Sequence, residues 1–510
     1  MHAKIYAATT LGIAAHIVEV EADLAYGVLT FNIVGLPDKA IKESKDRIKA
    51  AMKNSGLKVP ERLITINLAP ASLKKEDILF DVPIAVVILQ AAKLLTLTPE
   101  FIEETVFLGE LTLDGGVRPV RGVLSITHGA LKAGKKRVII PKSNEGEASL
   151  INGIEVIGVA SLHELVAYLR GECVIAPALS TFQQVRAIAH DSSLNFNQVR
   201  GQAQAKRALQ IAAAGRHNIL FIGPPGSGKT MLAKRLATIM PDMSFDEVIE
   251  ITKIYSVAGL LGNENSLLVN RPFRAPHHTI SQAGLVGGGS TPRPGEVSLA
   301  HQGILFLDEL TEFKRAALEV LREPLENKTV LISRATCSAE YPAACLLVAA
   351  LNPCPCGFYG DKTKQCVCAP MQINRYLSRL SGPLLDRIDL HVGVAAVAYD
   401  EVKGSTAHSS SSEQMFEQVL VAVAAQEKRF GGLRNASMSS HDVERYCILT
   451  PEAEAVVKLA FSRLGLSMRG YHKILKIART IADLEQSELI DRTHIQEAIT
   501  YRSLDQKLEA

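Results

Sequence analysis

The pattern of hydrophobic and polar positions divides the chain into three units. Up to about residue 170, short apolar runs alternate with helical stretches; the runs include LITINLA (63–69), VFLGELTL (106–113), KRVIIP (136–141) and IEVIGVA (154–160). This alternation predicts an α/β fold. A second α/β block follows to about residue 400, and the pattern from residue 413 onward is helical. We therefore predict an N-terminal α/β domain (1–170), an α/β core (198–400) and a C-terminal helical domain (413–510).

Two polar segments separate these units. Residues 171–197 contain Pro177 and the run Asp191-Ser192-Ser193, which predict a linker. Residues 404–414, GSTAHSSSSEQ, predict a loop. Three units also agree with the length of 510 residues, because domains average about 150 residues.

Residues Asp38–Lys53 predict an amphipathic helix in the N-terminal domain. Ile41, Ile48 and Met52 share one face of this helix. The rest of its surface is basic, with Lys39, Lys42, Lys45, Arg47, Lys49 and Lys53. That basic face is either a solvated surface or a surface that contacts phosphates.

Composition and charge narrow the class of protein. Hydrophobic residues make up 47% of the chain and charged residues 21%, as is typical of a globular protein. The first 24 residues lack the basic-then-apolar order of a signal peptide, and no run of about 18 apolar residues predicts a membrane span. We predict a cytoplasmic protein without a membrane partner. The net charge is only +3, so a surface for nucleic acid must be local.

The sequence FIGPPGSGKT (221–230) predicts a phosphate-binding loop. It follows the apolar run NILFIG and opens the helical segment MLAKRLATIM, which is the strand–loop–helix context that a P-loop requires. Its glycines let backbone N–H groups close around phosphates, while a lysine reaches the β- and γ-phosphates and a hydroxyl binds Mg²⁺. We predict that ATP and Mg²⁺ are held by Gly223, Pro224, Pro225, Gly226, Ser227, Gly228, Lys229 and Thr230.

Two carboxylates complement this loop. Residues 303–310, GILFLDEL, predict a buried parallel strand whose carboxyl end presents Asp308 and Glu309. Asp308 is expected to hold Mg²⁺ through water, and Glu309 to polarise the water that attacks the γ-phosphate. A carboxylate pair after a strand is otherwise often a helix cap, but next to a P-loop it favours hydrolysis.

Two further polar residues follow apolar runs. Asn352 ends the run CLLVAALN, where it is placed to orient the same water or to form a turn. Arg387 lies in LLDRIDLHV (384–392). It forms either a surface ion pair with Asp386 or Asp389, or an arginine finger that reaches the γ-phosphate of a neighbouring subunit.

These elements in this order resemble AAA+ ATPases. The segments RPFRAPHHT (271–279), GLVGGGSTPRPGEVSLAHQG (284–303), NPCPCG (352–357) and SMRGYHKILKIARTIADL (467–484) more specifically resemble the ComM/YifB family of magnesium-chelatase-like ATPases. The resemblance covers essentially the whole chain. It implies a hexameric ring of ATPase modules, each with a helical lid.

The resemblance also implies roles for single residues. Asn352 is implied as sensor 1, Arg387 as the arginine finger and Arg469 as sensor 2, with Arg463 as the alternative to Arg469. The segment that surrounds the adenine is implied to contain Gln198, Val199 and Gln202. Arg469 also heads a basic helix with Lys473, Lys476 and Arg479, from which a cation can reach phosphates.

The N-terminal domain resembles the proteolytic domain of Lon and the similar domain of RadA, in the stretch from Val106 to Glu145. Lon-type proteolysis needs a serine and a lysine that deprotonates it. The segment after Ser72, LKKEDILFDVPIAV, has no serine, and Leu124 stands where the lysine is expected. We predict a protease scaffold without protease chemistry, in which Lys74, Lys75 and Asp81 are structural or face DNA.

Four of the eight cysteines form a C-x-C…C-x-C pattern: Cys354, Cys356, Cys366 and Cys368. In a reducing compartment such thiols are metal ligands or free thiols, and four thiolates suit a structural Zn²⁺. We predict a zinc insertion at 354–368 that braces a loop near the pore of the ring. Cys337 and Cys345 are predicted to be thiols buried in the core. Adjacent His277 and His278 favour a loop or a substrate contact over metal ligation.

Two functions remain open. The first is a DNA motor, a helicase or branch-migration enzyme of natural transformation that acts on single-stranded or branched DNA. The second is a chelatase-like machine for protein remodelling or metal insertion. The basic helix and the cluster Lys132, Lys135, Lys136 and Arg137 favour DNA, because binding to a phosphate backbone requires clustered cations. The absence of an integrin-like domain or an acidic linker in the sequence argues against chelation.

Overall fold

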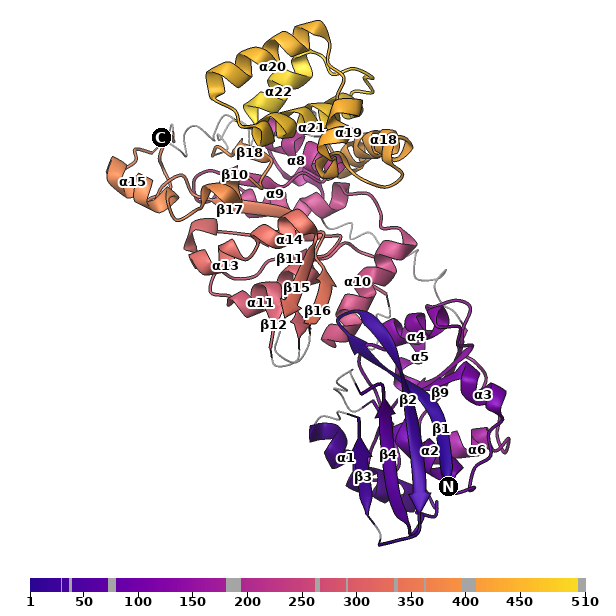
Figure 1. The fold of residues 1–510 in the computed structure, drawn as a ribbon. Helices are drawn as coiled ribbons and strands as arrows, with labels where there is room; N and C mark the ends of the chain where they lie inside the picture. Colours follow the sequence, from indigo (N-terminus) through magenta and orange to yellow (C-terminus); the bar gives the residue numbers. More distant parts are fainter. Residues whose placement is uncertain are drawn as a thin grey trace.

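The three units follow one another along the long axis of the molecule (Figure 1). The computed structural model describes residues 1–28, 30–35, 39–71, 79–179, 194–261, 267–289, 292–333, 338–361, 364–396 and 410–502. Ser72, Lys74, Lys75 and Cys337 lie outside these ranges, as do most of the predicted linker and loop. Within the described ranges, none of the helices has the length and hydropathy needed to cross a bilayer.

The N-terminal domain is built on a seven-stranded sheet with strand order β3-β4-β2-β1-β5-β8-β9. The four predicted runs all contribute to this region, although VFLGELTL is divided between β5 and the short β6 (Glu110–Leu111), which pairs with β7 (Val117–Arg118). The pairs β1–β2 and β2–β4 are antiparallel, and the other neighbours run parallel. The strands of the sheet are β1 (His2–Leu11), β2 (Ala14–Ala25), β3 (Phe31–Val34), β4 (Leu63–Ala69), β5 (Thr105–Phe107), β8 (Arg137–Pro141) and β9 (Glu155–Val159).

Two helices, α2 (Asp81–Ala91) and α4 (Val123–Lys132), pack on β1 and β2. α2 is apolar nearly all round, and ten of its eleven residues are buried, as expected for a helix inside a core. The basic helix α1 (Lys39–Asn54) lies on α2 and buries Ile41, Ile48 and Met52, as its periodicity predicted. The remaining helices of this domain are α3 (Pro99–Glu104), α5 (Glu145–Ala148) and α6 (Leu162–Leu169).

An ion pair between α1 and α2 decides between the two roles expected for Asp81 and corrects the expectation for Arg47. Arg47 Nε lies 2.6 Å from Asp81 Oδ2, and the Asp81 side chain is 2% exposed. Leu111 N also donates to Asp81, at 3.0 Å. Burial raises the pKa of Asp81, while the hydrogen bond from Arg47 opposes this shift. Asp81 is therefore a structural residue and does not face DNA, and Arg47 does not belong to the solvated face of α1.

The core contains a parallel five-stranded sheet with order β11-β14-β17-β10-β18. Its strands are β10 (Ile219–Ile222), β11 (Phe273–Arg274), β14 (Ile304–Leu307), β17 (Leu346–Leu351) and β18 (Leu390–Gly393). Because parallel strands end at one edge of a sheet, the residues that follow β10, β14 and β17 meet there. The core therefore brings the P-loop, the carboxylate pair and Asn352 together.

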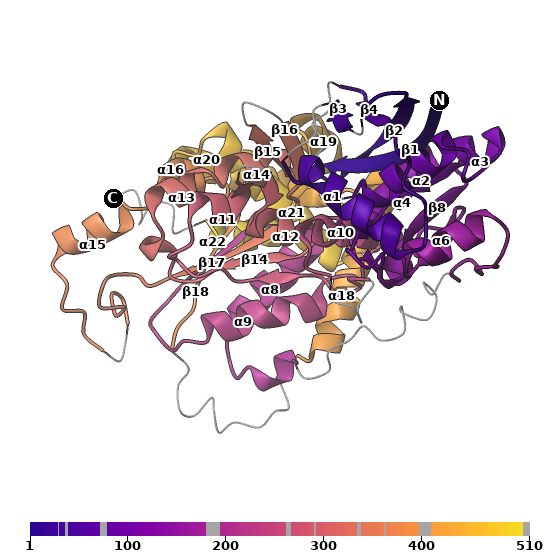
Figure 2. The same cartoon turned by 90° about the horizontal axis from the view of Figure 1, so that it is seen from below.

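Helices and two hairpins surround this sheet. The helices are α8 (Ala203–Gly215), α9 (Lys229–Arg235), α10 (Phe245–Ala258), α11 (Gln282–Val286), α12 (Glu296–Leu299), α13 (Arg315–Glu319), α14 (Arg322–Asn327), α15 (Pro370–Leu377) and α16 (Gly382–Leu385). The hairpins pair β12 (Gly287–Gly288) with β13 (Arg293–Pro294), and β15 (Thr329–Ser333) with β16 (Ser338–Pro342). Both views place α15 at the margin of the core, away from the N-terminal domain (Figures 1 and 2).

The C-terminal domain is helical, as predicted. It consists of α18 (Ser412–Phe430), α19 (Ser440–Tyr446), α20 (Pro451–Leu464), α21 (Met468–Leu484) and α22 (Arg492–Thr500). α18 and α21 pack on α8 of the core. Their buried residues form one hydrophobic cluster with the core strands, so burial of apolar surface holds this lid on the sheet.

The N-terminal domain docks on the core through α4 and α10. Leu124 is fully buried in the hydrophobic cluster at this contact, which also contains Ile254. The carboxylate of Glu147 accepts hydrogen bonds from Leu124 N and from Ser256 Oγ. Burial raises the pKa of Glu147. The residue that stands where the sequence expected a lysine therefore stabilises a domain contact.

Candidate nucleotide-hydrolysis site

The P-loop joins β10 to α9, and its backbone explains its glycines. Gly226 and Gly228 have φ values of +78° and +89°, a region that favours glycine. An added Cβ at Gly223 would lie 2.0 Å from the carbonyl oxygen of Val394, at the end of β18. The loop therefore takes its shape from local turns and from close packing against a neighbouring strand.

Lys229 links the P-loop to the end of β17. Its Nζ donates to the carbonyl oxygens of Gly223 at 2.7 Å and Pro224 at 2.9 Å, and to Asn352 Oδ1 at 3.2 Å. Burial lowers the pKa of Lys229, and the charges of Asp308 and Glu309 oppose that shift. The ammonium group thus lies beside the predicted sensor residue, where it can exchange carbonyl oxygens for phosphate oxygens.

Asp308 and Glu309 have different neighbours. Thr230 Oγ1 donates to Asp308 Oδ2 at 2.8 Å, which brings together the hydroxyl and the carboxylate predicted to hold Mg²⁺. Oxygen ligands of this kind suit that hard cation. Glu309 follows in a left-handed conformation, with φ +51° and ψ +50°, and its side chain is 57% exposed. An uncommon backbone conformation therefore directs the second carboxylate out of the strand.

Glu309 faces a cavity of about 600 Å³. The cavity is lined by Glu309, Glu312, Asn352, Pro355, Gln372, Arg375, Tyr376 and Arg379. Its walls thus come from the ends of β14 and β17, from the cysteine-bearing segment and from α15. The carboxylate of Glu309 and the amide of Asn352 therefore open onto one cavity, and their action on a shared water molecule stays a prediction.

His278 is a neighbour of Glu309 that the sequence analysis missed. Its Nδ1 lies 3.6 Å from Glu309 Oε2, and its ring lies 4.0 Å from that of His277. No local sequence signal marks this contact, because it depends on the order of the strands: the histidine pair follows β11, and β11 is the neighbour of β14. The pair lies outside any helix or strand, so the expected loop placement is confirmed, while a substrate contact stays a prediction.

The residues predicted around the adenine lie against α9 and the end of β18. Gln202 Nε2 donates to the carbonyl oxygen of Ala395 at 2.6 Å. Gln198 accepts a hydrogen bond from Arg235 on α9, and Val199 is buried. These contacts connect the segment to both flanks of the P-loop, and its role in binding adenine stays a prediction.

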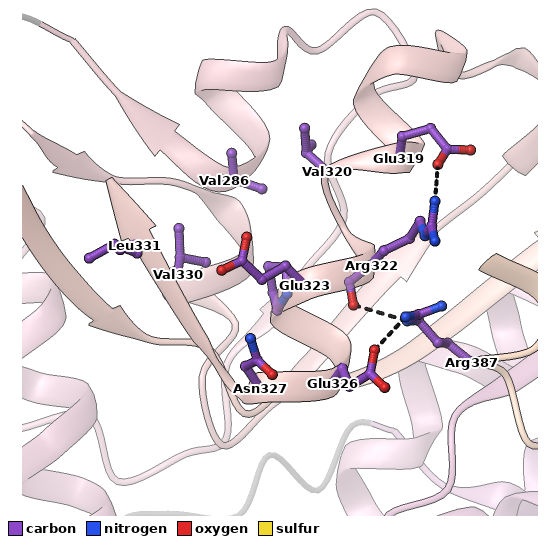
Figure 3. Close-up of a pocket in the computed structure, with 11 residues that line it drawn as sticks. Val286, Glu319, Val320, Arg322, Glu323, Glu326, Asn327, Val330, Leu331 and Arg387 are labelled. Atoms are coloured by element: carbon purple, nitrogen blue, oxygen red, sulfur yellow. Dashed lines mark hydrogen bonds and ion pairs between the residues drawn. The ribbon is translucent and has the colours of Figure 1, made fainter. Parts of the chain in front are cut away.

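Arg387 and Arg469 converge on one carboxylate. Arg387 contacts Glu326 on α14, donates to the carbonyl oxygen of Arg322 at 3.0 Å, and lines a cavity of about 500 Å³ (Figure 3). Arg469 Nη2 lies 3.5 Å from the other oxygen of Glu326. Among the described contacts of these two arginines, none is with the P-loop. Both guanidinium groups therefore occupy a face separate from the nucleotide site of their own chain.

Among its described contacts, Arg387 pairs with Glu326 and not with Asp386 or Asp389, the partners that the sequence suggested. Asp389 lies 3.1 Å from Lys473 Nζ and 3.4 Å from His217 Nδ1. Burial acts to raise the pKa of Asp389, but the charge of Lys473 and the hydrogen bond with His217 hold it well below the usual range. Arg479 is buried against Asp483 at 3.0 Å. The basic residues that follow Arg469 on α21 thus fix the lid to itself and to the core, and Arg469 remains partly exposed.

The four clustered cysteines converge as the C-x-C…C-x-C pattern suggested. Their sulfur atoms all lie within 4.8 Å of one another. Three of the distances are 3.3, 3.7 and 3.6 Å, from Cys354 to Cys356, from Cys354 to Cys366 and from Cys356 to Cys366. A tetrahedral Zn²⁺ with Zn–S bonds of about 2.3 Å requires S···S separations of about 3.8 Å. The donor set and its spacing therefore fit a closed structural zinc site.

We expect one Zn²⁺ per chain in protein purified under reducing, metal-replete conditions, because four convergent thiolates satisfy the ion. Elemental analysis measures this ratio. Cys366→Ser should lose the metal, whereas Cys173→Ser, outside the cluster, should retain it. A metal-free wild-type protein would favour free thiols.

Comparisons with known proteins agree with this geometry over nearly the whole chain. Residues 195–402 match the family described as "Magnesium chelatase, subunit ChlI". Residues 20–144 match "Subunit ChlI of Mg-chelatase", and residues 409–502 match "Magnesium chelatase, subunit ChlI C-terminal". The chain is 42% identical over 510 residues to "Competence protein ComM" of Haemophilus influenzae, covering 99% of this chain and 98% of the relative. The chain belongs to the ComM/YifB family of magnesium-chelatase-like ATPases.

Other members of the ComM/YifB family are similar over the same length. The "Uncharacterized protein YifB" of Escherichia coli is 42% identical over 504 residues, covering 99% of this chain and 97% of the relative. The "Uncharacterized protein Rv2897c" of Mycobacterium tuberculosis is 42% identical over 485 residues, or 94% of each chain. The predicted family and the α/β AAA+ fold with a C-terminal helical region are thereby confirmed. Membership of this family implies an ATPase that uses ATP and Mg²⁺.

Proposed function

We propose that the protein is a hexameric, ATP-driven DNA motor that acts in the cytoplasm as a helicase or branch-migration enzyme on single-stranded or branched DNA. The observation that carries the hydrolysis step is the convergence of Lys229, Thr230, Asp308 and Glu309 at one edge of the core sheet. The boundaries 1–170, 198–400 and 413–510, and the roles of the site residues, belong to the same proposal.

A ring is supported by the separation of two faces. Lys229 and Asp308 lie at the P-loop, whereas Arg387 and Arg469 lie at Glu326. In a closed ring the same pair of unlike faces repeats at every interface, so an arginine of one subunit can reach the nucleotide of the next. Such an arginine neutralises charge that develops during phosphoryl transfer.

DNA as the substrate is supported by a relative's name and by one surface of the N-terminal domain. A relative over the full length is named a competence protein, and competence is the uptake of DNA by bacteria. On α1, Lys45, Lys49 and Lys53 follow one another at intervals of four residues, so they share one side of the helix. A row of cations of this kind can contact successive phosphates.

The basic cluster at residues 132–137 gives less support for DNA binding, because three of its four cations already contact other residues of the domain. Lys135 is buried, with its Nζ 3.4 Å from the centre of the Tyr6 ring, and donates to the carbonyl oxygen of Glu103. Lys136 pairs with Glu104, and Arg137 pairs with Glu155 at 2.6 Å. The DNA proposal therefore depends on α1 rather than on residues 132–137.

Charge reversal on α1 should weaken DNA binding. We expect Lys45→Glu with Lys49→Glu to lower affinity for single-stranded DNA and to reduce the slope of log affinity against log salt by about two, one for each lost phosphate contact. Lys428→Glu with Lys458→Glu places the same charge change on exposed positions of the C-terminal helices and should leave the slope unchanged. If both double variants bound DNA with the same affinity and the same salt slope, the basic side of α1 would be a solvated surface that does not contact DNA.

The function itself is tested by the rate of ATP hydrolysis with and without single-stranded and forked DNA, together with strand displacement on the forked substrate. A DNA motor should hydrolyse ATP faster with DNA and separate the strands only when ATP is present. ATP hydrolysis that no DNA stimulates, without DNA binding, would favour the chelatase-like alternative, which the descriptions of the matching families also suggest.

A further inference from the structure

We propose that the cysteine loop, described over residues 353–361 and 364–368, is a positioning element of the P-loop, and that its bound metal thereby sets the affinity for ATP. The inference rests on the proposed ATPase function and adds to it a role for residues that do not touch the nucleotide. It predicts that ATP affinity depends on Gly357 and on the metal, while the chemical step depends on neither.

The cysteine loop packs tightly against the P-loop at Gly357. Gly357 is buried and has a φ of +86°. A Cβ added there would lie 2.4 Å from Cδ and 2.9 Å from Cγ of Pro225. The backbone of the cysteine loop therefore lies directly against the proline ring in the middle of the P-loop, and a methyl group at Gly357 must displace one of the two loops.

The cysteine loop is also continuous with two walls of the hydrolysis site. It begins directly after Asn352, which accepts a hydrogen bond from Lys229 at 3.2 Å. It ends two residues before α15, and Arg375 on α15 and Arg379 just after it line the cavity that Glu309 faces. Pro355, between the first two cysteines, lines the same cavity. The loop therefore adjoins the cavity through these residues, but its close packing contact with the nucleotide site is the one between Gly357 and the P-loop residue Pro225.

The metal gives this loop its rigidity. The described residues between the end of β17 and the start of α15 form no helix or strand, and a segment of this size cannot bury enough apolar surface to fix its own conformation. Four metal–sulfur bonds replace such a core. Without them Gly357 can leave Pro225, and ATP must then order a more mobile P-loop when it binds, which lowers its affinity. Asp308 and Glu309 follow β14 and keep their positions, so the chemical step is spared.

Two glycines of the same loop give a matched pair of variants. Gly357 and Gly360 both have positive φ values, +86° and +76°, so alanine introduces similar backbone strain at each. Only at Gly357 does the new methyl meet another residue, because nothing lies within 4 Å of a Cβ at Gly360. We expect Gly357→Ala to weaken binding of a fluorescent ATP analogue by roughly tenfold or more, while Gly360→Ala stays within about twofold of the wild type.

The kinetic signature separates positioning from general damage. Gly357→Ala should retain one Zn²⁺ per chain and unfold at a temperature close to that of Gly360→Ala. Its KM for ATP should rise, while kcat at saturating ATP stays within about threefold of the Gly360→Ala value, because a lost ground-state contact raises KM alone. In a Pro225→Ala background, which lacks the atoms that the methyl would strike, adding Gly357→Ala should weaken binding much less than it does in the wild type.

The dependence of ATP affinity on the metal is tested with the wild-type protein. Removing Zn²⁺ with a chelator should weaken binding of the same ATP analogue, and returning Zn²⁺ should restore it; Cys366→Ser should bind weakly with or without added Zn²⁺. Equal affinities for Gly357→Ala and Gly360→Ala, loss of zinc from Gly357→Ala, or unchanged affinity after metal removal would each overturn the inference. A wild-type protein that neither binds nor hydrolyses ATP would instead overturn the proposed function.

Discussion

Lys229→Ala is expected to abolish ATP binding, and Glu309→Gln to abolish hydrolysis while ATP stays bound. The lysine side chain supplies the positive charge at the P-loop, where its Nζ now holds two loop carbonyl oxygens. The glutamate carboxylate is the base that faces the cavity, and removal of a general base typically slows the reaction by roughly 10²- to 10⁴-fold. Binding of a fluorescent ATP analogue and steady-state release of phosphate measure the two effects separately.

Glu312→Gln is the matched control for the second variant. Glu312 lines the same cavity, but its carboxylate pairs with Arg379 at 3.2 Å. We expect it to lower turnover by less than about tenfold, since it does not follow β14 directly and contacts no residue of the P-loop among the described ones. Normal turnover by Glu309→Gln, or equal losses in Glu309→Gln and Glu312→Gln, would contradict the assignment of Glu309 as the base.

Mixing two inactive variants should restore part of the ATPase activity. Arg387→Ala lacks the finger and Lys229→Ala lacks the nucleotide site, so neither should hydrolyse ATP alone. In a mixed ring, an Arg387→Ala subunit keeps an intact P-loop and can receive Arg387 from a neighbouring Lys229→Ala subunit. The contact of Arg387 with Glu326, on a face separate from its own P-loop, is the structural reason for this expectation. An arginine in trans typically contributes about 10³- to 10⁵-fold to turnover.

The mixture of Lys229→Ala with Glu309→Gln is the control for this experiment. Both of these substitutions damage the nucleotide site of their own chain, so no arrangement of neighbours restores a complete site. Mass spectrometry of the assembled rings confirms that subunits have exchanged. Recovery in the control mixture, or no recovery in the first mixture despite exchange, would contradict a finger that acts between subunits.

The sequence by itself determined the elements whose chemistry is local. The P-loop was recognisable because its glycines, lysine and threonine occupy fixed positions between a strand and a helix, and the structure shows the positive φ values that those glycines permit. The apolar face of α1 followed from its period, since a helix repeats every 3.6 residues whatever it packs against. The cysteine pairs likewise predicted their own convergence, because both lie in one short segment.

Only the tertiary structure decided which distant residues meet and which cations are occupied. Glu309 and His278 are neighbours because β14 lies beside β11, a fact of strand order that no local pattern records. The sequence assigned Arg47 to the basic face of α1, but α1 lies on α2, where Asp81 pairs with Arg47. Gly357 was one glycine among many in the sequence, and its contact with Pro225 exists only because β17 and β10 are adjacent. Local propensities fix a helix or a turn, but contacts between such elements depend on how the strands are ordered, and that order is set by the packing of the whole core.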